Sequence, residues 1–302
     1  MPLHLPSALR GLLAGAVLAV STVAFTLLMM PPALLKLLRP PLTVRRVADH
    51  ALTGLAARWV ALNNAWIVAV RAPGTPEWDV QGLDGLDPRG WYIVSANHQS
   101  WVDILVLQRI FHGRIPFLKF FLKRQLLYVP VMGLAWWALD FPFMKRGQGR
   151  GSRQSDLKTT REACEKFKHI PTSVINFVEG TRFTPAKHAR QNSPYRHLLK
   201  PKIGGLGIAL ATMGEQFTAL LDVTIVYPHG APEFTDLLCG RIDAVRVRVQ
   251  PRSIPAELLG GDPVGDKAYR QRIAAWVDGQ WCDKDALIGE LLAASPQATP
   301  AR

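Results

Sequence analysis

The sequence predicts an α/β domain whose mixed, mostly parallel sheet is flanked by helices, preceded by an N-terminal helical element that anchors it to a membrane. From Gly90 onward, short apolar runs typical of strands alternate with segments of helical periodicity, which is the pattern of an α/β domain. The segment from Gly11 to Leu35 contains no charged residue. The three cysteines are widely spaced and form no CxxC pair, so they indicate neither a disulfide framework nor a zinc site.

The N-terminal apolar segment is long enough to cross roughly 30 Å of hydrocarbon. Its heavier positive flank follows it, from Lys36 to Arg46, so the positive-inside rule places the main body in the cytosol. A cleaved signal peptide is the alternative, but its apolar region would be shorter, and the MMPP sequence is a poor cleavage site. We therefore predict a retained anchor whose helix ends or kinks at the Pro31-Pro32 pair.

A second apolar stretch, residues 47–70, has its apolar side chains at helical spacing. Trp59 and Trp66 suit a helix that lies in the membrane interface, and a helix packed on the globular domain explains the same pattern equally well. Residues 72–89 are rich in Gly, Pro and Asp and indicate a loop with room for one short strand. The expected organisation is an anchor element at 1–75, the α/β domain at 76–294 and a disordered tail at 295–302.

Within the α/β domain, strands are expected where apolar runs are short. Val and Arg alternate over 244–249, as in a half-exposed strand. The predicted strands are 91–96, 115–118, 141–145, 173–178, 221–227 and 244–249. Longer amphipathic or apolar segments indicate helices, one of them interrupted at Pro130. The predicted helices are 100–111, part of 123–139, 155–168, 207–213 and 267–292.

The first chemical motif is NHQSWVD, residues 97–103, which follows a predicted strand. Five helical steps would leave His98 and Asp103 roughly 140° apart around a helix axis. The two side chains can meet if His98 lies in the turn before the helix, Ser100 caps it and Asp103 lies in its second turn. A histidine oriented by a carboxylate at the end of a strand could act as a general base. Alone, the spacing fits a structural histidine and a surface aspartate better.

The second motif, FVEGTR, also follows a predicted strand. Gly180 would let the backbone approach a ligand, and the guanidinium of Arg182 offers a forked donor suited to phosphate. Glu179 could hold a loop by hydrogen bonds. An ordinary strand-to-loop turn explains this motif alone, but the two motifs together are far more specific than either.

Together the motifs resemble the 1-acylglycerol-3-phosphate acyltransferases (lysophosphatidic acid acyltransferases, or PlsC-like glycerolipid acyltransferases). The resemblance runs from Tyr92 to Pro228 through four blocks in order: NHQSWVD, the region ending FPFMKR, FVEGTR and LLDVTIVYP. The string EGTRFTPAKH is especially similar to a membrane-bound bacterial branch of the type called YihG. Val178 departs from the family pattern, because many members have proline there, but this changes a turn residue and no reacting group.

The resemblance implies a role for each motif residue. His98 is the general base on the sn-2 hydroxyl of a lysophospholipid, and Asp103 orients it. The activated oxygen attacks the thioester of acyl-CoA or acyl carrier protein without a covalent acyl-enzyme, a cofactor or a metal. The acceptor phosphate is bound by Glu179, Gly180, Thr181 and Arg182, with help from Arg146. Lys202 adds charge near the site or is a solvated loop lysine.

The implied product is phosphatidic acid for phospholipid biosynthesis, made at the bacterial inner membrane by a catalytic domain that faces the cytosol. Acylation of another lysophospholipid, such as lysophosphatidylglycerol, is the nearest alternative. A catalytically silent membrane scaffold would not need all four of His98, Asp103, Glu179 and Arg182. The net charge of +13 alone would allow nucleic-acid binding, but no recognisable binding module accompanies it. The sequence also lacks a Gly-x-Ser-x-Gly elbow, a Walker A loop and a Rossmann fingerprint.

Overall fold

The structure is a computed structural model that describes residues 5–120, 122–141, 143–144, 162 and 171–294. The predicted helix at 155–168, the end of the predicted strand at 141–145 and the tail at 295–302 lie outside these residues. A six-stranded sheet forms the centre, in the order β1-β8-β7-β2-β6-β3. Its strands are β1 (Asp79–Gln81), β2 (Tyr92–Ala96), β3 (Leu118–Phe120), β6 (Ser173–Phe177), β7 (Ala219–Val226) and β8 (Arg246–Arg252).

All neighbouring strands of this sheet are parallel except β7 and β8, which confirms the predicted mixed, mostly parallel α/β fold. β2 lies between β6 and β7, and all five of its residues are buried. Its side chains alternate between two hydrophobic clusters, with Val94 in one and Ile93 in the other. A strand buried on both faces needs helices on both sides of the sheet.

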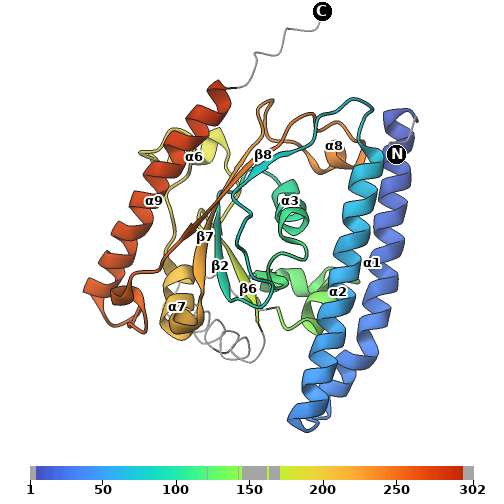
Figure 1. Ribbon diagram of the computed structural model, residues 1–302, viewed down its shortest axis with the longest axis horizontal. Coiled ribbons are helices and arrows are strands. Elements are labelled where there is room, and N and C mark those ends of the chain that lie inside the picture. Colours follow the sequence, from blue (N-terminus) through green and yellow to red (C-terminus); the bar gives the residue numbers. More distant parts are fainter. Residues whose placement is uncertain (1–4, 121, 142, 145–161, 163–170, 295–302) are drawn as a thin grey trace, which may run out of the picture.

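Helices supply these two covering layers (Figure 1). α3 (Val102–Phe111) packs on one face of the sheet, with α1 (Ser7–Leu37) and α2 (Leu42–Val70) beyond it. α7 (Gly204–Met213) and α9 (Lys267–Ala293) cover the other face. Among the described residues, the other short α-helices are α4 (Met132–Ala138), α6 (Pro185–Gln191) and α8 (Phe234–Leu238).

The N-terminal apolar segment forms one continuous helix, α1, which packs along α2. The helix passes through Pro31 and Pro32 and ends only at Leu37. Of the two predicted outcomes at the proline pair, an end or a kink, the end is therefore wrong. Two facts account for the continuation. The proline ring holds φ in the helical range, and Met29 and Ala33, on either side of the pair, are buried in a hydrophobic cluster with α2 and α4.

α2 turns its apolar positions toward the protein. Trp66 is buried, and its indole Nε1 donates to Asn63 Oδ1 at 3.0 Å. Ile67 and Val70 belong to the same hydrophobic cluster as α3 and the sheet. The packed-helix interpretation of this stretch is therefore confirmed for the face that carries Trp66.

Several short elements differ from the sequence prediction. β3 begins at Leu118, where the predicted strand ends. The short strand that the sequence allowed within residues 72–89 is β1. Pro130 does interrupt the next segment, separating a 3₁₀ turn at Arg124–Tyr128 from α4. β4 (Leu122–Lys123) and β5 (Phe143–Met144) pair with each other in a separate two-stranded sheet.

Candidate active site

The two sequence motifs meet at one edge of the sheet. His98 lies two residues after the end of β2, and Glu179 lies two residues after the end of β6. Ala96 and Phe177, the last residues of these parallel strands, are paired in the sheet. Tyr227 follows the neighbouring strand β7 directly. The carboxyl ends of three adjacent parallel strands therefore gather these side chains, as is usual for sites in α/β sheets.

His98 and Asp103 are in contact. The imidazole Nδ1 lies 2.8 Å from Asp103 Oδ2, and the aspartate is fully buried. His98 lies in the turn before α3, and Asp103 lies in the first turn of that helix, which begins at Val102. The expected contact of His98, in the turn before the helix, with Asp103 is present. The prediction that Asp103 lies in the second turn is wrong, because the helix begins at Val102, two residues after Ser100. The Ser100 hydroxyl accepts from the Val102 N–H at 3.1 Å.

The Asp103 carboxylate is surrounded by donors. Oδ2 also accepts from the backbone N–H groups of Gln99 at 2.7 Å and Ser100 at 2.9 Å, and Oδ1 accepts from the Tyr227 hydroxyl at 2.7 Å. Oδ2 already accepts hydrogen bonds from the two backbone N–H groups, so it does not donate to His98. In the contact between the two side chains the hydrogen is therefore carried by His98 Nδ1. The lone pair of the neutral imidazole is then on Nε2, the nitrogen available to a substrate.

The environment of His98 fixes the ring while leaving one edge accessible. The imidazole stacks on Phe177, with ring centroids 4.1 Å apart and planes 19° apart. Only 8% of the surface of His98 is exposed to solvent. The His98 carbonyl accepts from the Phe183 N–H at 2.7 Å, which ties the first motif to the loop after the second. A histidine held in this way can take a proton from a hydroxyl without first reorienting.

Glu179 is the buried link between the motifs. Oε1 accepts from the His98 N–H at 2.7 Å, and Oε2 accepts from the Leu199 N–H at 2.9 Å. Burial raises the pKa of Glu179 to about 7, although the two N–H groups oppose this shift. Glu179 thus contributes by holding the backbone of His98. Its assignment to substrate binding stays a prediction.

The Gly180–Arg182 turn is shaped by glycine and fixed by a lysine. Gly180 has a φ of 67°, a left-handed conformation that side chains disfavour, and its N–H donates to Phe177 O at 2.8 Å. The Lys187 ammonium donates to the Thr181 hydroxyl at 2.9 Å and to the Arg182 carbonyl at 2.8 Å. The exposed Arg182 guanidinium lies over the Trp101 ring, 4.8 Å from its centroid. This turn presents a positive charge within the same site as His98.

The structure adds residues that the sequence did not assign. Tyr227 was recognised only as part of an apolar block, yet its hydroxyl contacts Asp103. Burial first, and Asp103 second, raise the pKa of the Tyr227 hydroxyl, so it stays a donor. The Asn97 side chain exchanges two hydrogen bonds of 2.8 Å with the backbone of Ile225 and so joins β2 to β7 at the site. Tyr227 and Asn97 each directly follow a strand, and this position was the signal in the sequence that could have assigned them to the site.

α9 supports the site from behind the sheet. The Trp281 indole donates to Leu199 O at 2.9 Å, next to the N–H that Glu179 holds. One turn later, the buried Lys284 forms an ion pair with Asp222 at 2.6 Å. Burial lowers the pKa of Lys284, and Asp222 opposes this shift. These contacts lock α9 to β7 and to the segment that carries Leu199.

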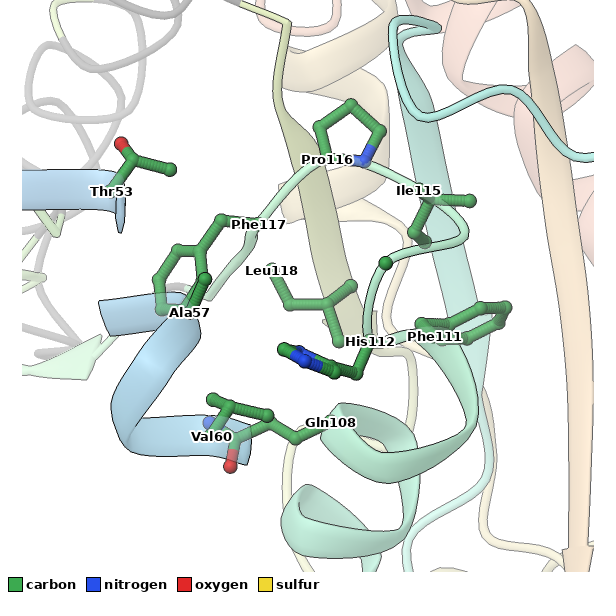
Figure 2. A pocket seen from close by; sticks show the side chains of 11 residues that line it. Thr53, Ala57, Val60, Gln108, Phe111, His112, Ile115, Pro116, Phe117 and Leu118 are labelled. Atoms are coloured by element: carbon green, nitrogen blue, oxygen red, sulfur yellow. The ribbon is translucent and has the colours of Figure 1, made fainter. Parts of the chain in front are cut away.

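Other predicted and candidate features lie away from this edge. Arg146 lies outside the described residues. A pocket of about 170 Å³ opens between α2 and the carboxyl end of α3, where Val60, Phe111 and His112 line it (Figure 2). It contains none of the site residues. No group of three or more His, Cys, Asp and Glu within the described ranges is arranged to hold a metal ion.

Comparisons with known proteins agree with this geometry. A family model described as Acyltransferase matches residues 77–228. The 1-acyl-sn-glycerol-3-phosphate acyltransferase 2 of Arabidopsis thaliana is 30% identical over 216 residues, which is 67% of this chain and 52% of that protein. The 1-acyl-sn-glycerol-3-phosphate acyltransferase delta of Homo sapiens is 25% identical over 225 residues, 68% of this chain and 56% of that protein. The chain therefore spans about half the length of the curated relatives that it matches.

A solved structure has the same fold over nearly the whole chain. The crystal structure of the 1-acyl-sn-glycerophosphate (LPA) acyltransferase PlsC from Thermotoga maritima superposes with a TM-score of 0.56 at 20% sequence identity. The match covers 96% of this chain and 100% of that one, so it includes the region of the N-terminal helices.

Proposed function

The chain belongs to the acyltransferase family, and we propose that it transfers an acyl group from an acyl thioester to the sn-2 hydroxyl of 1-acylglycerol-3-phosphate, giving phosphatidic acid. The observation that carries the proposal is the contact of His98 Nδ1 with the buried Asp103, at a strand end that adjoins a cationic turn. A base and a phosphate-binding group at the same edge are what a hydroxyl-bearing phosphate ester requires.

The proposed reaction needs one proton acceptor that later returns the proton. His98 Nε2 takes the proton of the sn-2 hydroxyl while that oxygen attacks the thioester carbonyl carbon. The resulting imidazolium is stabilised by Asp103, as in other histidine–carboxylate pairs. When the tetrahedral intermediate collapses, the C–S bond breaks and the leaving sulfur receives the proton from His98. The acyl group moves directly between the substrates, so no nucleophilic Ser or Cys takes part.

Arg182 supplies the contact to the acceptor in this proposal. Its guanidinium is exposed and rests on Trp101, where it can turn two N–H donors toward a phosphate. The acyl donor is acyl-CoA or acyl carrier protein, and acylation of lysophosphatidylglycerol is the alternative reaction. Membership of the YihG-like branch stays a prediction.

We also propose that the N-terminal helices hold the enzyme at the bacterial inner membrane, with the α/β domain in the cytosol. α1 is apolar and long enough to cross a membrane, judged by length and composition. Its outward side chains are exposed, among them Leu12, Val20 and Leu27. A single apolar helix of this kind is weak support on its own, but both substrates carry acyl chains that partition into lipid.

The proposed reaction is tested by supplying purified enzyme in neutral detergent micelles with a panel of acceptors. Lysophosphatidic acid should be acylated faster than lysophosphatidylglycerol at equal concentration, with acyl-CoA and acyl carrier protein compared as donors. Arg182→Ala should raise the KM for lysophosphatidic acid and leave the KM for the donor unchanged. A preference for lysophosphatidylglycerol, or an effect of this variant on the donor alone, would contradict the assignment.

A further inference from the structure

Besides Arg182 and Lys187, another cation lies beside the Gly180 turn, on a segment that neither sequence motif includes. Residues 199–202 are hydrogen-bonded at two points to the residues that directly follow β6. The Leu199 N–H donates to Glu179, and the Lys202 N–H donates to Val178 O at 2.7 Å. The backbone of Lys202 is therefore fixed next to the turn that carries Arg182.

The Lys202 side chain lies directly over Gly180. A Cβ at Gly180 would stand 3.1 Å from Lys202 Cδ and 3.4 Å from its Nζ. The glycine thus serves two purposes, since it adopts a positive φ and leaves room for the lysine. The contact also places the ammonium group close to the turn, while Lys202 as a residue remains exposed to solvent.

Neither Lys202 nor Arg182 forms an ion pair with a carboxylate of the described residues. The acid nearest to Arg182 in sequence, Glu179, is buried, and both of its oxygens already accept backbone N–H groups. Elsewhere cations at the sheet are paired, as Arg248 is with Asp79 at 2.7 Å. Lys187 adds a positive charge to this turn, but its ammonium already donates to the Thr181 hydroxyl and the Arg182 carbonyl. Arg182 and Lys202 are thus two further positive charges at the Gly180 turn, and their natural counterpart is an anion from outside the protein.

We propose that Lys202 and Arg182 together bind the phosphate of the acceptor, one from each side of Gly180. This inference rests on the proposed function and extends it to specificity. A phosphate monoester carries a charge of roughly −1.5 to −2 near pH 7, whereas the phosphodiester of lysophosphatidylglycerol carries a single charge. Two cations match the charge of the monoester. Lys202 therefore selects lysophosphatidic acid over acceptors whose phosphate bears a second ester.

The test uses Lys202→Gln, which keeps a polar, flexible side chain but removes its charge. The matched control is Lys200→Gln, since Lys200 is an exposed lysine on the same segment. In neutral detergent micelles, Lys202→Gln should raise the KM for lysophosphatidic acid about ten- to hundredfold, as expected for a lost charged hydrogen bond. Its kcat should change little, and its preference for lysophosphatidic acid over lysophosphatidylglycerol should fall by a similar factor.

Lys202→Arg should retain most of the affinity, and thermal unfolding should show that all three variants are folded. An unchanged acceptor KM in Lys202→Gln, or an equal effect of Lys200→Gln, would overturn the assignment of Lys202. A rise in the KM for acyl-CoA instead would assign the lysine to the donor and also overturn it. A wild-type enzyme that does not acylate lysophosphatidic acid would contradict the proposed function itself, a failure that is visible before any variant is measured.

Discussion

His98 is held by three separate contacts. Asp103 accepts from its ring, Glu179 accepts from its N–H, and the Phe183 N–H donates to its carbonyl. Stacking on Phe177 restricts the remaining rotation of the ring. Asp103 belongs to the same motif as His98, whereas Glu179 and Phe183 come from the segment after β6, so the base is oriented by both motifs together and not by its own loop alone.

Asp103→Asn tests the orientation of the base. An amide has one oxygen, so the NH₂ group must face at least one of the four donors that now point at the carboxylate. The variant also removes the negative charge that stabilises the imidazolium, and kcat should fall by roughly 10³- to 10⁴-fold. Steady-state kinetics with lysophosphatidic acid measure this, and a fall of less than tenfold in a folded variant would contradict the role of Asp103.

Glu179 should make the stability of the protein depend on pH. Its pKa is raised from 4.5 to about 7 in the folded state. Between these values the folded chain keeps a proton that the unfolded chain has lost, so the free energy of unfolding should decrease as the pH rises. Urea unfolding across this range should show a shallower decrease in Glu179→Gln than in the wild-type protein. Parallel curves for the two proteins would show that Glu179 does not titrate there.

At the scale of elements, β2, β6 and β7 carry the site and are also the strands that the sequence predicts best. Each is an apolar run buried on both faces, which gives a strong local signal. The same signal places His98 and Glu179 at strand ends, and the alternation of strands and helices predicts that these ends share one edge of the sheet.

Short elements and long-range contacts escaped sequence-based prediction for physical reasons. α6 and α8 span few residues and have no measurable periodicity, and α8 depends on a capping box between Glu233 and Asp236. Tyr227 and Lys202 reach the site only through the pairing of β7 and the contact with Val178. The strand-end position of Tyr227 and the charge of Lys202 are visible in the sequence, but neither shows which side chains or turns these residues contact.

Trp281→Phe tests whether α9 supports the site. The variant removes the indole donor to Leu199 O and part of a fully buried side chain. The free energy of unfolding should fall by about 2–4 kcal/mol. Trp276→Phe is the control, because Trp276 lies on the same helix and is only partly buried. Equal effects of the two substitutions on urea unfolding would mean that the contact with Leu199 adds no stability.

At the scale of the whole molecule, the catalytic edge and the apolar helices belong to one folded body. α1, α2 and α3 share a hydrophobic cluster with the sheet, and the buried Arg10 guanidinium of α1 donates to Val70 O at the end of α2. The outward face of α1 remains apolar and exposed. Attachment of this face to lipid would therefore fix the position of the catalytic domain relative to the bilayer.

Val20→Glu tests that attachment, because Val20 is 69% exposed on α1. A charge on an apolar membrane-facing surface is costly, so the fraction of protein that sediments with phospholipid vesicles should fall severalfold. Val264→Glu adds the same charge at an exposed apolar residue outside the N-terminal helices and should have no effect. Vesicle binding that Val20→Glu leaves unchanged would contradict the membrane role of α1.

The most direct test of the proposed reaction is acyl transfer to lysophosphatidic acid by His98→Ala, measured beside the wild-type enzyme under the same conditions. The variant removes Nε2, the only proton acceptor that the proposed reaction uses. Phosphatidic acid should form with the wild-type enzyme, while the rate with the variant should fall by about 10²- to 10⁴-fold, with the thermal unfolding transition retained. Near-normal formation of phosphatidic acid by folded His98→Ala would contradict the proposed mechanism.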